Sequence, residues 1–148
     1  MKISFGADMH NHVTEHIVEG LRAQGHEVQV HRQPSGAPMQ WPDVGAAVAR
    51  AVASGQVDEG IVCCWTGTGV SIAANKISGV RAALCGDAET ARGARRYDDA
   101  NVLCLGLRTT TEAIADEVIG AWLDQRAVDD DQVDNIAKIA VLEARPEA

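Results

Sequence analysis

The stretch Gly60–Lys76 reads GIVCCWTGTGVSIAANK and carries the strongest structural signal in the chain. Its apolar residues Ile61–Cys64 predict a buried β-strand, the glycines that follow predict a tight turn, and Ser71–Ala74 predict the start of a helix. Glycine lets a backbone approach a ligand closely, and a helix N-terminus favours negative charge. A strand–turn–helix unit of this kind is therefore typical of sites that bind anions.

Cys64 lies two residues before the glycine turn, where the same positive field favours the thiolate form. Cys63 precedes it on the strand and is expected to face the other side of the sheet, because side chains alternate along a strand. A base beside a site for developing negative charge suggests enolate-type chemistry. The alternative left open by spacing alone is a small buried cysteine next to an ordinary turn.

The composition is that of a soluble globular protein, with 148 residues of which 46% are hydrophobic and 23% charged. We expect one domain over residues 1–148. Thirteen basic and 21 acidic residues give a formal net charge of −8, which argues against nucleic acid or an acidic membrane surface as a partner. No apolar run approaches the roughly 20 residues that span a bilayer, and no signal peptide precedes the first predicted strand.

The four cysteines show no CxxC spacing and lie in apolar runs, which predicts free thiols in a reducing cytoplasm and no zinc ribbon. The segment His12–His16 (HVTEH) matches the HxxEH pattern of some metal sites. No third ligand is marked downstream, so a solvated first helix turn is the favoured interpretation. We expect no metal and no cofactor.

Strand-like and helical segments alternate along the chain, which predicts a three-layer α/β/α Rossmann-like fold with a doubly wound sheet of five parallel strands. The expected strands are Lys2–Ala7, His26–His31, Gly60–Cys64, Val80–Cys85 and Asn101–Leu105. The expected helices are Val13–Gln24, Asp43–Ser54 with Asp43 as N-cap, Gly69–Ile77, Ala88–Arg96, Thr111–Asp124 and a last helix over about 131–143. The last helix is expected outside the sheet, docked either on a partner subunit or on the chain's own sheet.

Two common phosphate-binding motifs do not fit. The turn after the first strand reads GADMHN where a dinucleotide fingerprint requires GxGxxG. A cysteine phosphatase loop requires an arginine six residues after the nucleophile, and the chain has Gly69 after Cys63 and Val70 after Cys64.

Several segments, in order, resemble the family of ribose-5-phosphate isomerase B and galactose-6-phosphate isomerase. The residues Cys64–Lys76 are similar to the family's CGTGxGxSIAANK, and the likeness continues through Val80–Cys85, Asp98–Gly106 and Trp122–Leu123. The resemblance covers nearly the whole chain. It implies a cofactor-free aldose–ketose isomerase that works through a cis-enediolate, in a site built between two subunits of a homodimer or dimer of dimers.

The resemblance also implies roles for individual residues. Cys64 occupies the position of the base that moves a proton between C1 and C2, and the backbone of Trp65–Gly69 that of the anion hole. Asp8 matches a sugar-binding aspartate, and Arg108 matches an arginine that helps to hold the substrate phosphate. The candidate catalytic residues are Cys64, Tyr97 and Thr66, and the candidate substrate-binding residues are Asp8, Met9, His10, Trp65, Gly67, Thr68, Gly69, Asp98, Arg108, Asp131 and Asn135.

The chain departs from the family at several of these positions. Tyr97 stands in place of the histidine that opens the sugar ring, and Asp98 in place of the following asparagine. Met9 replaces the histidine after the first-strand aspartate, with His10 one place later. Trp65 replaces a small residue in the turn and is expected either to narrow the pocket or simply to pack.

The departures with the largest consequence lie near the C-terminus. An ungapped alignment from Trp122 onward places Asp131 and Asn135 at two phosphate-binding arginines of the neighbouring subunit. Bidentate arginine–phosphate pairs supply much of the affinity of such a site, so phosphate binding there should be weak. Cations that could compensate are Arg126, Lys138, Arg92, Arg95 and Arg96.

The sequence therefore favours an aldose–ketose isomerase with Cys64 as base, acting on a sugar or sugar phosphate that need not be ribose 5-phosphate. The alternative is a sugar- or nucleotide-binding module that kept the fold and lost the chemistry. A metal-dependent hydrolase using His12, Glu15 and His16 is the third and least favoured hypothesis.

Overall fold

The computed structural model describes residues 1–144, which contain a five-stranded sheet with helices on both faces. The strands are all parallel and lie in the order β2-β1-β3-β5-β4, which confirms the predicted doubly wound sheet. Their bounds are β1 (Lys2–Ala7), β2 (Glu27–His31), β3 (Glu59–Cys64), β4 (Ala82–Leu84) and β5 (Val102–Gly106).

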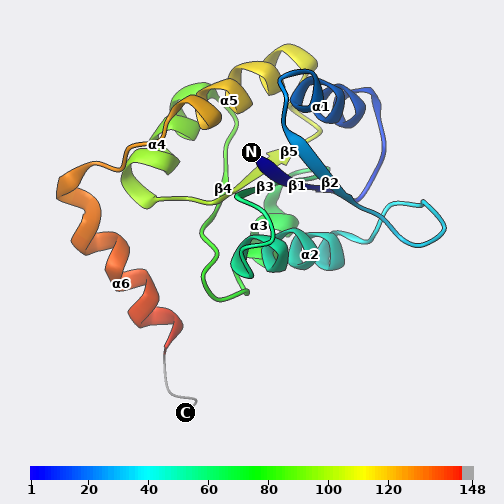
Figure 1. The fold of residues 1–148 in the computed structure, drawn as a ribbon. Helices are drawn as coiled ribbons and strands as arrows, with labels where there is room; N and C mark the ends of the chain where they lie inside the picture. The colour runs from blue at the N-terminus through cyan, green and yellow to red at the C-terminus, as the bar shows by residue number, and fades with distance from the viewer. Residues whose placement is uncertain (145–148) are drawn as a thin grey trace.

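Two separate hydrophobic clusters hold the helices against the sheet. One face carries α1 (His12–Ala23), α4 (Ala88–Asp98) and α5 (Glu112–Asp124), and the other carries α2 (Trp41–Ala53) and α3 (Thr68–Ala74) (Figure 1). Cys63 belongs to the first cluster and Cys64 to the second, as the alternation of side chains along β3 predicts.

The order of the strands determines where a site can form. From β1 the chain moves outward to β2 on one side; from β3 it crosses to β4 at the other edge and then returns to β5, which lies between β3 and β4. The carboxyl ends of β1 and β3 therefore meet at the topological switch point, the usual position of ligands in such sheets. The Asp8 N–H donates to the Cys63 carbonyl oxygen at 3.2 Å, so the turn after β1 lies directly beside the end of β3.

Several element boundaries differ from the sequence-based expectation. Strand β4 covers Ala82–Leu84 where Val80–Cys85 was expected, and α3 ends at Ala74 where Ile77 was expected. The prediction that Asp43 caps the second helix is wrong, because α2 begins at Trp41 with Gln40 as N-cap and Pro42 inside the first turn. Proline is tolerated there, since the first N–H groups of a helix have no intrahelical acceptor. Helix α4 continues past Arg96 to Asp98, so that Tyr97 and Asp98 belong to the helix.

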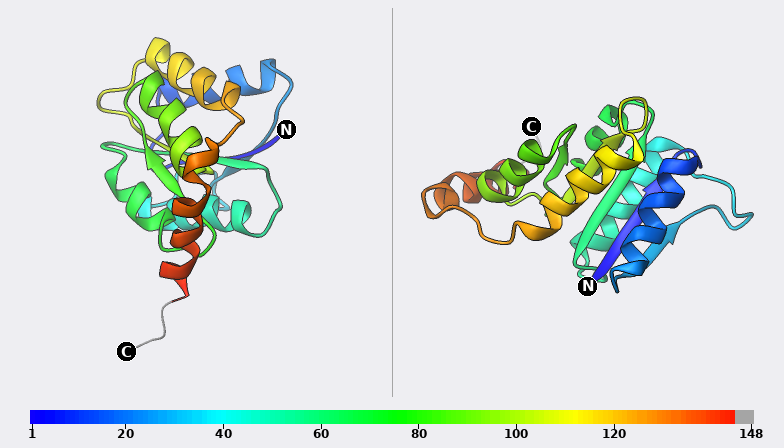
Figure 2. Two further views of the ribbon diagram at one scale, coloured as in Figure 1. Left: turned by 90° about the vertical axis from the view of Figure 1, so that its left-hand side faces the viewer. Right: turned by 90° about the horizontal axis from the view of Figure 1, so that it is seen from above.

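The last helix, α6 (Val133–Glu143), follows a short 3₁₀ turn, η1 (Asp130–Gln132), and has no buried residue. It extends from the α4 side of the molecule, away from α1 and β2 (Figures 1 and 2). The Glu143 carboxylate accepts the Gly79 N–H at 2.9 Å, and Arg96 pairs with Asp129 just before the 3₁₀ turn. The alternative in which this helix packs on the chain's own sheet is wrong. No helix among residues 1–144 has the length and apolar character to cross a membrane.

A buried polar network joins the start of β3 to α4 and α5. Glu59, only 4% exposed, accepts hydrogen bonds from Trp122 Nε1 at 2.7 Å, Arg126 Nη1 at 2.7 Å and Arg95 Nη2 at 2.9 Å. The Arg95 guanidinium also lies over the Trp122 ring, 5.1 Å from its centroid. The carboxylate is fully paired, as a charge in a buried position must be.

The histidines of the HVTEH segment pair with carboxylates of the neighbouring helix. His12 Nδ1 lies 2.9 Å from Glu112 Oε1, and His16 Nε2 lies 2.8 Å from Asp116 Oδ1. Two histidine–carboxylate pairs, each between residues 100 positions apart, therefore connect α1 to α5. Residues 1–144 contain no group of three or more metal-ligating side chains placed to hold an ion. The segment therefore forms a contact between two helices.

This contact should make stability depend on pH. The hydrogen bond to Asp116 raises the pKa of His16 above its ordinary value of 6.5. A raised pKa in the folded state stabilises the protein fully below pH 6.5 and loses that stabilisation as pH rises through the folded pKa. Asp116→Asn should therefore lower the free energy of unfolding, measured with urea, more at pH 5.5 than at pH 8.5. The control Glu117→Gln, on an exposed position of α5, should show no such difference; equal losses for Asp116→Asn at both pH values would refute the contact's role.

Candidate active site

A pocket lies beyond the carboxyl ends of β1 and β3, at the switch point of the sheet. Cys64, the last residue of β3, lines it together with the turn that leads into α3. The full lining is Asp8, Trp41, Cys64, Trp65, Thr66, Thr68 and Gly69. Five predicted substrate-binding or catalytic positions around Cys64 thus come together with it in one place.

The glycine turn holds the Cys64 sulfur in position. The Gly67 N–H donates to Cys64 Sγ at an N···S distance of 3.2 Å, within a buried part of the turn. Gly67 has φ = +76°, and a Cβ at this position would lie 2.9 Å from the Gly106 nitrogen. Only glycine adopts this conformation without strain and fits the space, so Gly67 supports the pocket from behind and does not line it.

Asp8 brings an unpaired carboxylate oxygen to the pocket. Its Oδ1 atom is buried and has no hydrogen-bond partner among the described residues. Desolvation raises the pKa of the carboxyl group, and a hydrogen bond from the residue's own N–H partly offsets this rise. A buried polar atom without a partner is costly and unusual in a folded protein. The position suits a ligand hydroxyl that would donate to it.

Two tryptophans border the pocket. Trp65 is 52% exposed and Trp41 43% exposed, although tryptophan is usually well buried. The Trp41 ring lies directly on Gly69, where a Cβ would come within 2.8 Å of Cε3. Trp41 is a pocket residue that was not among those expected from the sequence. The topology could have indicated Trp41, because in a parallel sheet the loop after β2 begins at the same carboxyl edge at which β3 ends with Cys64.

The other three thiols lie in different environments. Burial raises the pKa of Cys63 and of Cys104 far above the ordinary value, and it raises the pKa of Cys85 to about 12. All four cysteines are free, and these three stay protonated at neutral pH. Cys64 is the one thiol that lines the pocket at the switch point.

Three predicted residues adjoin the pocket without lining it. The Arg108 N–H donates to the Trp65 carbonyl oxygen at 2.8 Å, which ties the turn after β5 to the Cys64 turn. Met9 packs against the hydrophobic cluster beneath α1, α4 and α5. His10 lines a separate groove between α1 and β2.

The remaining four predicted residues lie elsewhere in the chain. Tyr97 and Asp98 line a second hollow beside β4, together with Leu84 and Cys85. Asp131 lies in η1 and Asn135 in α6, where Asn135 bonds to Gln132. Within the described residues, one chain does not bring these four side chains to Cys64.

The fold and this pocket define a Rossmann-like α/β protein with a cysteine at the switch point, and comparison with known proteins identifies its family. The model of the family described as Ribose/Galactose Isomerase matches residues 3–139. Ribose-5-phosphate isomerase B of Escherichia coli is 37% identical over 145 residues, 97% of each chain, and D-erythrulose-4-phosphate isomerase of Pectobacterium atrosepticum is 34% identical over 97% of this chain and 95% of its own length. The structure of Clostridium thermocellum ribose-5-phosphate isomerase B superimposes with a TM-score of 0.90 at 38% identity, covering 97% of both chains. The chain belongs to the ribose/galactose isomerase family and is an aldose–ketose isomerase of the sugar or sugar-phosphate class.

Proposed function

We propose that this protein interconverts an aldose and a ketose without a cofactor, with Cys64 as the base. The observation that carries the proposal is the Cys64 sulfur, fixed by the Gly67 N–H in a pocket that also holds the unpaired Asp8 carboxylate. The thiolate of Cys64 takes the proton from C2 of the open-chain aldose. The resulting enediolate carries negative charge on the C1 oxygen.

In this proposal the backbone N–H groups of the Trp65–Gly69 turn stabilise that charge, apart from the Gly67 N–H, which donates to Cys64 Sγ. The turn lines the pocket, and fixed backbone groups need no reorganisation during the reaction. A proton moves from O2 to O1 within the enediolate, and the Cys64 thiol then returns its proton to C1, so that the ketose carbonyl forms at C2. In this proposal Asp8 accepts a substrate hydroxyl, and the hydroxyls of Thr66 and Thr68, whose oxygens lie 2.7 Å apart, form a polar wall. Free thiols in all four positions agree with a reducing cytoplasm.

A homodimer or dimer of dimers would complete this site. Tyr97, Asp98, Asp131 and Asn135 lie away from the Cys64 pocket of their own chain, so in the proposal a partner subunit supplies them. Exposed apolar side chains support such an interface; they include Ile72, Leu84, Tyr97, Val133, Val141 and Leu142. Light scattering at micromolar concentration should give at least twice the chain mass, and a monomer alone would remove the composite site.

The cations that could replace the missing phosphate-binding arginines are already engaged. Arg92 pairs with Glu89, and Arg96 with Asp129. Arg95 and Arg126 both bind the buried Glu59 carboxylate. Lys138 donates to Asn135. Their use by a substrate would require these contacts to break.

Ribose 5-phosphate is therefore expected to be a poor substrate. Loss of two charge-assisted hydrogen bonds at about 1.5–3 kcal/mol each weakens binding by orders of magnitude, even with Arg108 retained. Kinetics on a panel of free and phosphorylated tetroses, pentoses and hexoses tests this, with D-erythrulose 4-phosphate included because a relative is named for it. Another substrate should exceed ribose 5-phosphate in kcat/KM. A kcat/KM for ribose 5-phosphate of about 10⁴ M⁻¹s⁻¹ or more would contradict the expectation.

A further inference from the structure

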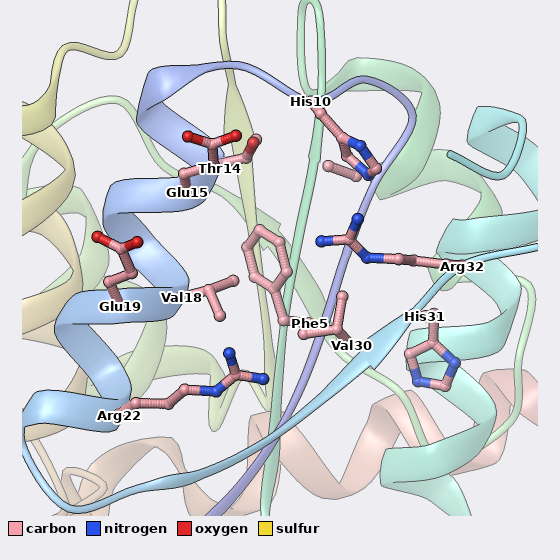
Figure 3. A pocket seen from close by; sticks show the side chains of 11 residues that line it. Phe5, His10, Thr14, Glu15, Val18, Glu19, Arg22, Val30, His31 and Arg32 are labelled. Carbon is pink, nitrogen blue, oxygen red and sulfur yellow. The ribbon is translucent and has the colours of Figure 1, made fainter. Parts of the chain in front are cut away.

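The groove between α1 and the edge strand β2, which His10 lines, is separate from the Cys64 pocket and from the hollow beside β4; we call it the α1–β2 groove (Figure 3). Its volume is about 170 Å³. Its floor is apolar and consists of Phe5, Val18 and Val30, which Figure 3 shows side by side between the two elements. A small ligand would find both an apolar base and a polar border here.

The border of the groove carries cations. In Figure 3 the Arg32 guanidinium lies beside the His10 ring on the β2 side, and Arg22, from the last turn of α1, extends over the floor. The carboxylates of Glu15 and Glu19 lie along α1 on the opposite side of Phe5 from Arg32. The groove thus has a cationic end formed by Arg32, which follows β2, with the His10 ring beside it.

Within residues 1–144 the two arginines of this groove form no ion pair with a carboxylate, although Glu15 and Glu19 line the same groove. The arginine–carboxylate ion pairs within residues 1–144 engage Arg81, Arg92, Arg95, Arg96 and Arg126. Neither Arg22 nor Arg32 takes part, although the protein has 21 acidic residues against 13 basic ones. An arginine fork left open in so acidic a chain is available to an external anion, and it matches phosphate oxygens in bidentate geometry.

A neighbouring histidine is held in place by the sheet. His31, the last residue of β2, also lines the groove, and its Nε2 atom lies 2.7 Å from the Ser4 hydroxyl oxygen. Burial lowers the pKa of His31, so the ring is neutral at pH 7. The positive charge at this end therefore comes from Arg32, and His31 contributes a fixed polar wall.

The groove shares a wall with the Cys64 pocket. Ala7 and His10 line the groove, whereas Asp8, between them in the same turn, lines the pocket. The turn after β1 therefore lies between the Cys64 pocket and the cationic end of the α1–β2 groove.

From these contacts we propose that the α1–β2 groove binds a phosphate dianion, held by Arg32 with His10 and Arg22. Within one chain the groove lies at the β2 edge of the sheet, whereas positions 131 and 135, which carry no cation, lie in η1 and α6 on the α4 side. The phosphate belongs either to the isomerised sugar, in which case the inference rests on the proposed function, or to a separate phosphorylated small molecule. Both sources present the same oxygens to the arginine fork.

Titration of the intact protein with inorganic phosphate, followed by calorimetry, tests the site. Arg32→Gln should weaken binding by at least about tenfold, because one charge-assisted contact is lost. The matched control is Arg50→Gln, an exposed arginine in a different hollow on α2, and it should leave the affinity unchanged. Absence of saturable binding at millimolar phosphate, or equal weakening by both variants, would overturn the proposal.

Kinetics separate the two sources. If the phosphate is that of the substrate, inorganic phosphate should inhibit isomerisation competitively, and Arg32→Gln should raise KM at nearly unchanged kcat. If it belongs to another molecule, phosphate should still bind with substrate at saturation. The calorimetric titration needs no turnover. A protein with no isomerase activity would therefore contradict the proposed function, whereas the titration alone would decide whether the groove binds phosphate.

Discussion

Cys64→Ala is expected to lower kcat by about 10²–10⁴, the usual contribution of a general base. The loss should fall on kcat more than on KM, because the thiolate acts on the proton in the transition state and the side chain contributes little to ground-state binding. The measurement is steady-state kinetics on the best substrate of the panel. The fold should survive, since Cys64 lies at the end of β3 and the alanine loses only the hydrogen bond that the sulfur accepts from the Gly67 N–H.

The matched control is Cys63→Ala, which removes the neighbouring thiol on the opposite face of the sheet. It should cost some stability, since Cys63 is fully buried, and leave kcat close to that of the wild type. Alkylation at neutral pH, followed by mass spectrometry, should also label Cys64 before the other thiols. Equal loss of kcat in both variants, or first labelling of Cys85, would count against the assignment.

Glu59→Ala is expected to lower the free energy of unfolding by about 3–5 kcal/mol, because it leaves a buried guanidinium without its counter-charge. Arg95, with 11% of its side chain exposed, would lose the carboxylate, and the Trp122 N–H would lose its acceptor. A loss of this size is a large share of the stability of an ordinary domain. Urea unfolding followed by circular dichroism measures it.

A surface ion pair provides the comparison. Glu89→Ala removes the partner of Arg92 in an exposed i,i+3 pair on α4 and should cost less than about 1 kcal/mol. Arg126→Met should lie between the two, because Arg126 is half exposed and Arg95 would still neutralise Glu59. Similar losses for Glu59→Ala and Glu89→Ala would show that the buried network contributes no more than a surface pair.

Local signals in the sequence predicted most of the fold. Apolar alternation and the glycine turn after β3 act over a few residues, so they can be read from the chain directly. The start of α2 was predicted wrongly at Asp43, a common N-cap residue type, whereas the helix begins at Trp41 and holds Pro42 in its first turn.

The parts that could not be predicted depend on contacts between distant residues. Trp41 borders the pocket because the β2–α2 connection starts at the edge of the sheet where Cys64 ends β3. The periodicity of apolar residues does not show which loops meet at that edge. Arg95 binds Glu59, 36 positions away in the sequence. Because of this contact, Arg95 is not available to bind a substrate phosphate. The family likeness placed Tyr97 and Asp131 in one site with Cys64, and the structure of one chain separates them.

The central claim is that the Cys64 sulfur carries the proton between the two carbons of the substrate. Isomerisation in deuterated water, followed by nuclear magnetic resonance of the recovered sugar, tests it most directly, since a monoprotic base exchanges its proton with solvent between the two half-reactions. The wild type should introduce deuterium at the carbon that receives the proton. Cys64→Ala should slow this exchange by about 10²–10⁴, whereas Cys63→Ala should leave its rate unchanged. Deuterium entering at the wild-type rate in Cys64→Ala would contradict the central claim.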